Sequence, residues 1–446
     1  MMRKESVLAF CIGLAFIAAP GNVRAESGSD KPQIKSSSNA EKKTGFLDQT
    51  TLTGDWDGAR TAMFEKGGAR LIVNYVMDFT GNVVGGIKKA GRQASDVFAG
   101  VNLDWGKWSK KLDGFSFQVS MIWRFGANLS TDAIGNQFQV QQNYGGEGIR
   151  LYDLWIKKSF DDGRYFIRLG RFSQGDDFLT DPIYSVYVNN AIDGNSKSVF
   201  YNSPISAYPF ATWALMAYLN PVDEWYAKIG VYGADTRLFD SSSHGMSFGA
   251  DFNEGFFIIA QTGYLLRQGK NDRGLSGKYS VGGYYDTGKF DVYGGSPGQQ
   301  VTGVWGGYVM MDQMLYREGL SDRGLVLWMS AVVGPENTSM MPYFVDGGLV
   351  YKGLFPKRGS DKLAIGAAWG RFGAALERQQ KAAGIVPQVY EIILELDYMV
   401  QLTKFFYITP DIQYIINPSG RGEINPRGDI PVSNALVLGL QSGLIF

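Results

Sequence analysis

The sequence predicts an all-β protein whose antiparallel strands close into a transmembrane β-barrel, with one short N-terminal helix. From Arg70 to the end, apolar residues recur at every second position, which is typical of strands with one apolar face. The alternating segments are about 8 to 13 residues long, near the ~9 to 11 residues that a tilted strand needs to cross hydrocarbon. After residue 25 no apolar run is long enough for a membrane helix, so a bilayer crossing requires a closed barrel.

The N-terminal region divides into targeting and spacing segments. Residues 1–25 have a basic start at Arg3 and Lys4, a short apolar stretch, and small residues before a cleavage point after Ala25, which predicts a signal peptide. Residues 26–50 are polar and rich in Lys and Ser, which predicts a flexible periplasmic leader. We expect a short helix over 55–65 and assign 51–446 to the barrel domain.

Composition excludes several classes of site. The chain has one histidine, His244, and one cysteine, Cys11, so neither a His-based metal cluster nor a disulfide framework can form. The 43 basic and 43 acidic residues balance, which gives no support for a nucleic-acid partner. High glycine and aromatic content with 19% charged residues suits aromatic girdles around a lumen lined by small residues.

Counting the alternating segments predicts an even number of strands. In 390–398 the even positions are apolar and three enclosed odd positions are carboxylates, so we assign the apolar side to lipid and the polar side to the lumen. The count reaches 18, and two weak members, 245–252 and 288–294, leave 16 or 18. With both termini periplasmic, the connections 161–163, 220–224, 253–255, 287–288 and 402–404 become short turns, whereas 126–148, 173–209, 373–387 and 417–433 become long outer loops.

Short motifs in a fixed order resemble the OprB-type carbohydrate-selective porins over 51–446. The segments that carry the resemblance are 52–60 (LTGDWDGAR), 150–155 (RLYDLW), 285–288 (YDTG), 312–316 (DQMLY), 410–414 (PDIQY), 417–418 (NP) and 434–439 (NALVLG). The resemblance implies a 16-stranded barrel in the outer membrane of a Gram-negative bacterium, exported through a signal peptide. It further implies passive diffusion of glucose-like sugars into the periplasm, without a cofactor. Gln261 and Leu215 depart from the family pattern, which has a glutamate and a basic residue there.

Sugar selectivity needs groups that hydrogen-bond adjacent hydroxyls and rings on which a sugar can stack. We expect the candidate pore-lining residues to come from the inward alternation and from loop 173–209, which in many porins folds into the barrel. The inward candidates are Arg124, Asp153, Trp155, Arg168, Glu391, Glu395, Asp411 and Gln413; the loop candidates are Asp176 and Asp177, with Tyr184 and Tyr187. On the same alternation Tyr152 is expected to face outward. Opposed acidic and basic walls would favour polar, uncharged solutes.

Three alternative functions are compatible with the sequence. An anion-selective or general diffusion channel is the alternative within the porin class. An outer-membrane enzyme could use His244 with Ser247, or Glu391 with Glu395 as a glycosidase pair. A soluble secreted β-protein would show the same alternation with apolar residues inside.

The resemblance also predicts partners. These are sugar substrates, outer-membrane lipid and lipopolysaccharide, the barrel assembly machinery through the last strand ending at Phe446, and a homo-oligomer.

Overall fold

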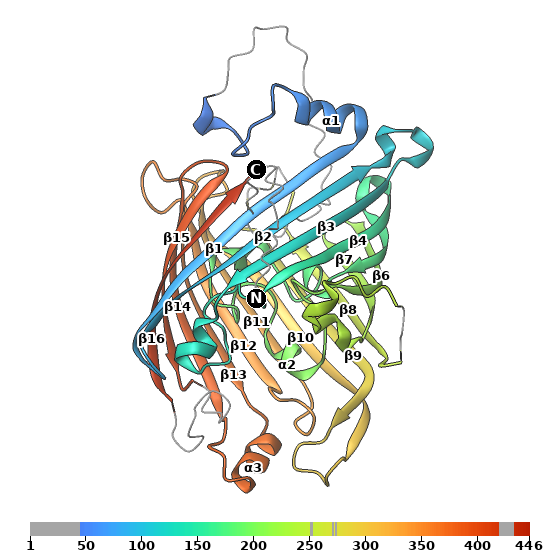
Figure 1. Ribbon diagram of the computed structural model, residues 1–446. Coiled ribbons are helices and arrows are strands. Elements are labelled where there is room, and N and C mark those ends of the chain that lie inside the picture. The colour runs from blue at the N-terminus through green and yellow to red at the C-terminus, as the bar shows by residue number, and fades with distance from the viewer. Residues whose placement is uncertain (1–44, 250–252, 270–271, 273, 419–431) are drawn as a thin grey trace, which may run out of the picture.

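The computed structural model describes residues 45–249, 253–269, 272, 274–418 and 432–446 (Figure 1). The predicted signal peptide 1–25, most of the leader 26–50 and most of the outer loop 417–433 lie outside these ranges. No helix within the described ranges is long and apolar enough to cross a membrane.

Sixteen antiparallel strands in the described ranges form one closed barrel. Each strand pairs with its neighbours in the sequence, and β1 pairs with β16 to close the ring (Figure 1). The strands are β1 Ala69–Gly86, β2 Ala90–Asp104, β3 Phe115–Gly126, β4 Gly148–Phe160, β5 Tyr165–Phe172, β6 Thr212–Val222, β7 Trp225–Gly233, β8 Phe256–Leu266, β9 Gly277–Asp291, β10 Gln300–Arg317, β11 Gly324–Val333, β12 Tyr343–Lys352, β13 Lys362–Arg371, β14 Tyr390–Gln401, β15 Phe406–Ile416 and β16 Ser433–Ile445. The predicted fold class is confirmed, with the smaller strand count.

The two weak segments explain the difference between 16 and 18. Residues 245–249 are not a strand, and 288–291 continue β9. The predicted turn at Thr287 and Gly288 was therefore wrong. The β9–β10 register shifts there, and the N–H of Gly288 donates to the Asp286 carboxylate at 2.9 Å, so the pair forms a bulge within one strand. The predicted turn 253–255 was also wrong, since these residues end the long connection before β8.

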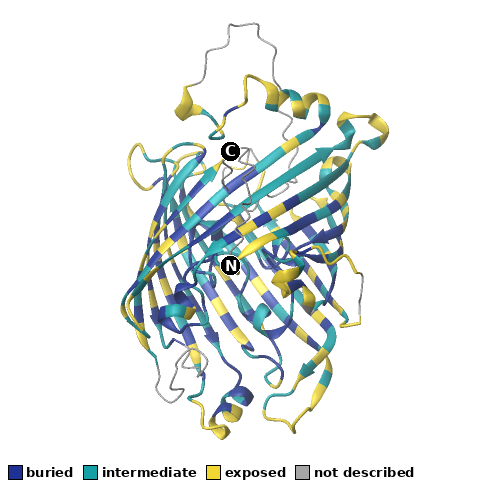
Figure 2. Cartoon of the chain, in the orientation of Figure 1, coloured by how far each residue is buried: buried dark blue, intermediate teal, exposed yellow. Residues whose placement is uncertain are grey.

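The apolar residues of the alternating pattern face outward and the polar residues face the lumen, as the sequence predicted. In β14, Leu394 and Leu396 are exposed on the outside of the barrel, whereas Glu395 and Asp397 between them are buried on the inside. Figure 2 shows this alternation of buried and exposed residues along the strands. A period of two places successive side chains on opposite faces, so one face meets lipid and the other meets the lumen.

The two ends of the barrel differ. The helix α1 (Ala59–Gly67) and the C-terminal end of β16 lie at one end, and α3 (Ala374–Ala382) lies at the other (Figure 1). The α3 end carries the long connections 127–147 and 173–211, the second of which contains α2 (Ser198–Asn202). In barrels of the outer membrane the short turns are periplasmic and the long loops are outside. The α1 end is therefore the periplasmic end.

The predicted helix begins later than expected. It starts at Ala59 rather than Asp55, because Trp56, Asp57 and Gly58 have φ of 52°, 54° and 89° and form turns. Its C-cap, Gly68, is also left-handed, with φ of 66°, and a Cβ there would lie 2.2 Å from the carbonyl oxygen of Asp104. Only glycine fits this junction between α1 and β1.

Candidate functional site

The connection 173–211 folds into the barrel, as expected for the loop after the fifth strand. The backbone N–H groups of Val188 and Asn189 donate to the same carboxylate oxygen of Glu395 on β14, each at 2.8 Å. The Asn202 side chain donates to the carbonyl of Met341 at 2.9 Å and accepts from its N–H at 3.0 Å. The loop is thus tied to the wall opposite the strands from which it leaves.

Aromatic packing adds a second attachment for this loop. Trp328 on β11 is fully buried, with the rings of Tyr184 and Tyr187 at centroid distances of 4.6 and 5.5 Å. The indole N–H of Trp328 donates to the Tyr187 hydroxyl at 3.0 Å. Each such ring pair contributes about 0.5 to 1.5 kcal/mol beyond area burial. Both tyrosines proposed as pore contacts therefore hold the loop to the wall.

A second loop, 127–147, also enters the lumen, which the sequence analysis did not predict. The N–H groups of Gln137 and Phe138 donate to Glu391 at 2.9 and 2.7 Å, and the Gln413 side chain donates to the carbonyl of Val140 at 3.0 Å. Phe138 and Val140 are fully buried. Four large apolar residues in this loop, Leu129, Ile134, Phe138 and Val140, were the available sequence signal, because such residues need a buried site.

The acidic side of the lumen is covered by these two loops. Glu391, Glu395, Asp411 and Gln413 all point inward as predicted, but each is buried. The two glutamates accept backbone N–H groups of the loops, and Gln413 also accepts from the Asn189 side chain at 2.9 Å. Asp411 accepts instead from the Gln413 side chain on its own strand, at 2.9 Å.

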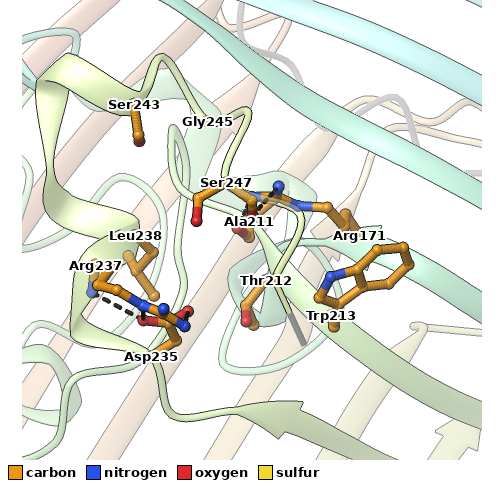
Figure 3. Close-up of a pocket in the computed structure, with 11 residues that line it drawn as sticks. Arg171, Ala211, Thr212, Trp213, Asp235, Arg237, Leu238, Ser243, Gly245 and Ser247 are labelled. Atoms are coloured by element: carbon orange, nitrogen blue, oxygen red, sulfur yellow. Dashed lines mark hydrogen bonds and ion pairs between the residues drawn. The ribbon is translucent and has the colours of Figure 1, made fainter. Parts of the chain in front are cut away.

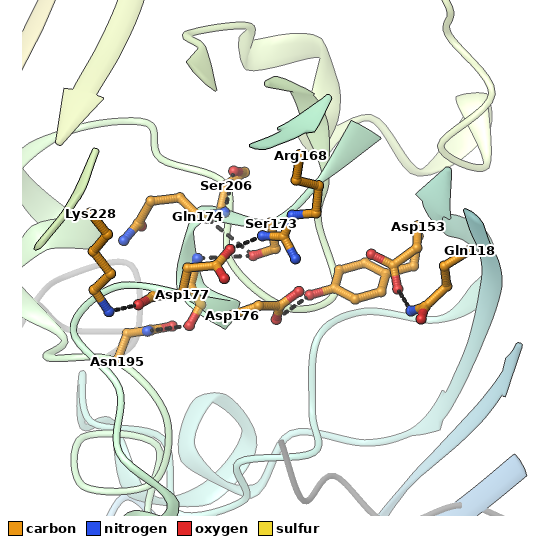
Figure 4. Close-up of polar contacts among 12 residues, drawn as sticks. Gln118, Asp153, Arg168, Ser173, Gln174, Asp176, Asp177, Asn195, Ser206 and Lys228 are labelled. Atoms are coloured by element: carbon orange, nitrogen blue, oxygen red, sulfur yellow. Dashed lines mark hydrogen bonds and ion pairs between the residues drawn. The ribbon is translucent and has the colours of Figure 1, made fainter. Parts of the chain in front are cut away.

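The opposite side of the lumen, on β4 and β5, presents the other predicted residues (Figure 4). Arg168 forms an ion pair with Asp177 of the loop 173–211, and both side chains keep partial exposure, 12% and 15%. The guanidinium carbon lies 3.9 Å from the ring centroid of Phe172 and 5.5 Å from that of Trp155. Lys228 on β7 donates to the backbone carbonyl of Asp177. A planar cation, a carboxylate and aromatic rings thus meet here.

Asp153 and Asp176 lie beside this pair in more enclosed positions. Asp153 accepts from Gln118 at 2.7 Å and from Ser120 at 2.8 Å, and it is buried. Asp176 accepts from the hydroxyl of Tyr152 at 2.6 Å. Burial, reinforced by the nearby charge of Asp153, raises the pKa of Asp176 well above its usual value.

The inward position of Tyr152 corrects the sequence prediction. The β3–β4 register shifts between Val119 and Met121, so two residues of β4 oppose one residue of β3. Such a bulge places the side chains on either side of it out of strict alternation. Tyr152 and Asp153 consequently both reach the lumen, and both are buried.

Arg124 faces inward but lies beneath the loop. Its Nε donates to Asp96 at 2.5 Å, and its guanidinium stacks on the Tyr208 ring at 4.7 Å. The Tyr208 hydroxyl donates to the other oxygen of Asp96 at 2.7 Å. Since Arg124 and Asp96 are both buried, this pair fixes the end of the loop 173–211 to β2 and β3.

The two departures from the family pattern have different consequences. Leu215 is exposed on the lipid-facing side of β6, so its side chain does not reach the lumen. Gln261 is buried on the inner side, where it donates to the Tyr226 hydroxyl at 2.6 Å and accepts from the Tyr308 hydroxyl at 3.1 Å. A neutral amide satisfies both phenols at that position.

A separate pocket lies on the outer side of the barrel near the α3 end (Figure 3). It lies between the outward-facing Arg171 and Trp213 and the connection that follows β7. Arg171 donates to the carbonyl oxygens of Ser247 and Ala211 at 2.8 and 3.2 Å. His244 bonds through Nδ1 to the carbonyl of Ile149 at 2.8 Å, so this histidine holds the connection to β4.

Sixteen strands, lipid-facing apolar side chains and two loops folded into the lumen define an outer-membrane diffusion channel. A family model for the carbohydrate-selective porins of the OprB family matches residues 88–446. The chain belongs to that family. It is accordingly a sugar-selective porin of the Gram-negative outer membrane.

Two individual relatives support this assignment. Porin B of Pseudomonas aeruginosa is 28% identical over 436 residues, covering 89% of this chain and 91% of that protein. The high-pH structure of Pseudomonas putida OprB matches with a TM-score of 0.81 and 27% identity, over 90% of this chain and 100% of that chain. The low-pH structure of the same protein, at 22% identity and a TM-score of 0.58, covers 90% of this chain and 99% of that chain and shares the fold.

Proposed function

We propose that sugars pass between the loop 173–211 and the inner wall of β4 to β7, in contact with Arg168 and Asp177. The observation that carries this proposal is the partial exposure of the Arg168 and Asp177 pair within the lumen. The carboxylates of β14 and β15, by contrast, are buried beneath the loops.

The chemistry of these groups suits a sugar. A sugar hydroxyl both donates and accepts hydrogen bonds. Arg168 can therefore donate to the hydroxyl oxygen while Asp177 accepts a hydrogen bond from the same hydroxyl. The ring of Trp155 is buried and lies 5.5 Å from the Arg168 guanidinium, which helps to hold that cation in place. The passage that we propose is diffusion down a gradient, without an energy source.

The same arrangement argues against catalysis in the lumen. Glu391 and Glu395 would be the acid and base of a glycosidase, but each accepts backbone N–H groups of a loop. A carboxylate held in this way is not free to protonate a leaving group. We therefore propose that the chain is a channel and not an enzyme.

We further propose that the protein contacts outer-membrane lipid and lipopolysaccharide, forms a homo-oligomer, and is inserted by the barrel assembly machinery. Phe446 is buried in the closed barrel, and its N–H donates to the carbonyl of Val73 at 3.0 Å. Recognition of the last strand by the assembly machinery would therefore precede barrel closure.

The test is sugar block of ion current through the purified channel in planar bilayers. Glucose or a short oligosaccharide should reduce the current, and Arg168→Ala should raise the half-blocking concentration about tenfold, the loss expected for one charged hydrogen bond. Arg358→Ala, in a turn at the α1 end, is the matched control and should leave block unchanged. A current that no sugar reduces would contradict the proposed function.

A further inference from the structure

We infer that the periplasmic end of the lumen holds a subsite for anionic sugars, with the sugar carboxylate at Lys157 and the sugar ring on Phe166 and Tyr218. This inference rests on the proposed function and names a substrate class for it. The subsite lies on β4, β5 and β6, near the α1 end of each strand and below the loop 173–211.

Lys157 is the starting point because its ammonium group lacks a polar partner. It faces the lumen opposite Arg168 on β5 and is only partly exposed. Its Nζ has neither a hydrogen bond nor an ion pair with a residue of the described ranges. It lies 5.9 Å from the centroid of Trp155 and 5.4 Å from that of Phe166. An ammonium group withdrawn from water without a counter-ion is costly, and a bound anion would offset that cost.

The carboxyl groups near Lys157 bind other side chains. Three cations, Lys157, Arg168 and Lys228, face this part of the lumen from β4, β5 and β7. Arg168 is paired with Asp177, and the carboxylate of Asp153 accepts from Gln118 and Ser120. Asp176, the third carboxyl group, accepts from the Tyr152 hydroxyl at 2.6 Å.

Three aromatic rings form a shelf beside Lys157. Phe166 stacks on Tyr218 with a centroid distance of 5.1 Å and 15° between planes, and Tyr218 stacks on Tyr226 at 6.0 Å and 21°. A Cβ on Gly263 would lie 2.4 Å from the Tyr226 ring, so this ring lies flat on the wall over a glycine. Phe166 and Tyr218 keep partial exposure to the lumen.

The combination selects a ligand that is both ring-shaped and negatively charged. A pyranose presents a face of C–H groups to an aromatic shelf, and its hydroxyls can reach Arg168 and Asp177. A carboxylate on the ring then meets the Lys157 ammonium group in a partly desolvated site, where charge-assisted hydrogen bonds are strong. Uronic acids have this chemistry, whereas a neutral hexose leaves Lys157 without a partner.

The first experiment compares glucose with glucuronate on the wild-type channel. The two share a pyranose ring and differ at C6, where glucuronate has a carboxylate. In planar bilayers at constant ionic strength, glucuronate should block at a concentration about tenfold lower than glucose, the factor expected for one charge-assisted hydrogen bond. The neutral methyl ester of glucuronate should block at the same concentration as glucose. This comparison uses only the wild-type protein, so it does not depend on the folding of a variant.

The second experiment assigns the preference to Lys157. Lys157→Gln should bring glucuronate to within about twofold of glucose. Lys158→Gln is the matched control, because the neighbouring lysine faces outward and donates to the carbonyl of Asp113 at 2.5 Å. Phe166→Ala should weaken block by both sugars. Heat-modifiable migration on a denaturing gel verifies that each variant is folded.

The outcomes separate the two claims. Equal block by glucose and glucuronate in the wild type, or an unchanged preference in folded Lys157→Gln, overturns the anionic subsite and leaves the sugar channel standing. If neither sugar blocks the current, the proposed function fails as well.

Discussion

Asp176 and Asp177 are neighbours in the loop 173–211 with different electrostatic environments. Asp177 pairs with Arg168, whereas burial and the nearby Asp153 raise the pKa of Asp176 well above its usual value. One residue step along the chain thus separates a carboxylate paired with a cation from a carboxyl group whose pKa burial raises.

This difference predicts that two isosteric substitutions change the reversal potential by different amounts. Asp177→Asn removes a negative charge beside the passage and should shift the reversal potential in a salt gradient toward anion selectivity. Asp176→Asn changes a carboxyl group whose pKa burial raises, and it should shift the reversal potential less at pH 7. A shift of equal size in both variants would contradict this difference.

Lys197, also in the loop 173–211, gives a prediction for pH dependence. Burial lowers the pKa of this lysine to about 8. Because the folded state holds the proton less tightly than the unfolded chain, the lysine destabilises the fold at neutral pH. That penalty disappears as pH rises from about 8 to about 10.4. Lys197→Met should therefore raise the thermal unfolding midpoint at pH 7 by more than at pH 10. A larger gain at pH 10 would contradict this.

At the scale of elements, the loops rather than the strands decide which charges are accessible. The strand pairing of β14 fixes the direction of Glu395, but the backbone of the loop 173–211 determines that this carboxylate is covered. Two buried N–H groups then depend on one side chain. Leaving a buried N–H unsatisfied costs about 1 to 3 kcal/mol, so this carboxylate is a large part of what holds the loop.

Removing the carboxylate should release the loop without opening the barrel. Glu395→Ala leaves the N–H groups of Val188 and Asn189 without their acceptor and should increase single-channel conductance and open-channel noise. The control is Glu377→Ala on α3, which removes ion pairs with Arg371 and Lys381. Unchanged conductance in Glu395→Ala would show that the aromatic contacts alone fix the loop.

Strand residues and loop contacts differ in how far the sequence could predict them. Alternation is a local property, so the inward direction of Glu391, Glu395 and Asp411 followed from residue spacing alone. Their burial depends on a loop more than 200 residues away in the chain, for which the spacing carries no information. Tyr152 was assigned to the wrong face because a bulge needs the partner strand to be recognised.

At the scale of the whole molecule, the barrel depends on the junction between its first and last strands. β1 and β16 pair from Asn74 and Ile445 onward. The α1 segment secures this junction from the periplasmic end: Arg60 donates to the main-chain oxygens of Phe446 at 2.5 Å and Leu71 at 3.3 Å. The N–H of Leu52 donates to the carbonyl of Ile445 at 2.7 Å.

Arg60 should therefore stabilise the closed barrel as a whole. Arg60→Ala removes charge-assisted hydrogen bonds from both closing strands, which together contribute about 1 to 3 kcal/mol. We expect a lower temperature for the conversion of the compact band to the unfolded band on a denaturing gel, with single-channel conductance unchanged because no lumen residue is altered. Lys66→Ala, an exposed position on the same helix, should convert at the wild-type temperature. Equal conversion temperatures for Arg60→Ala and the wild type would mean that strand pairing alone closes the ring.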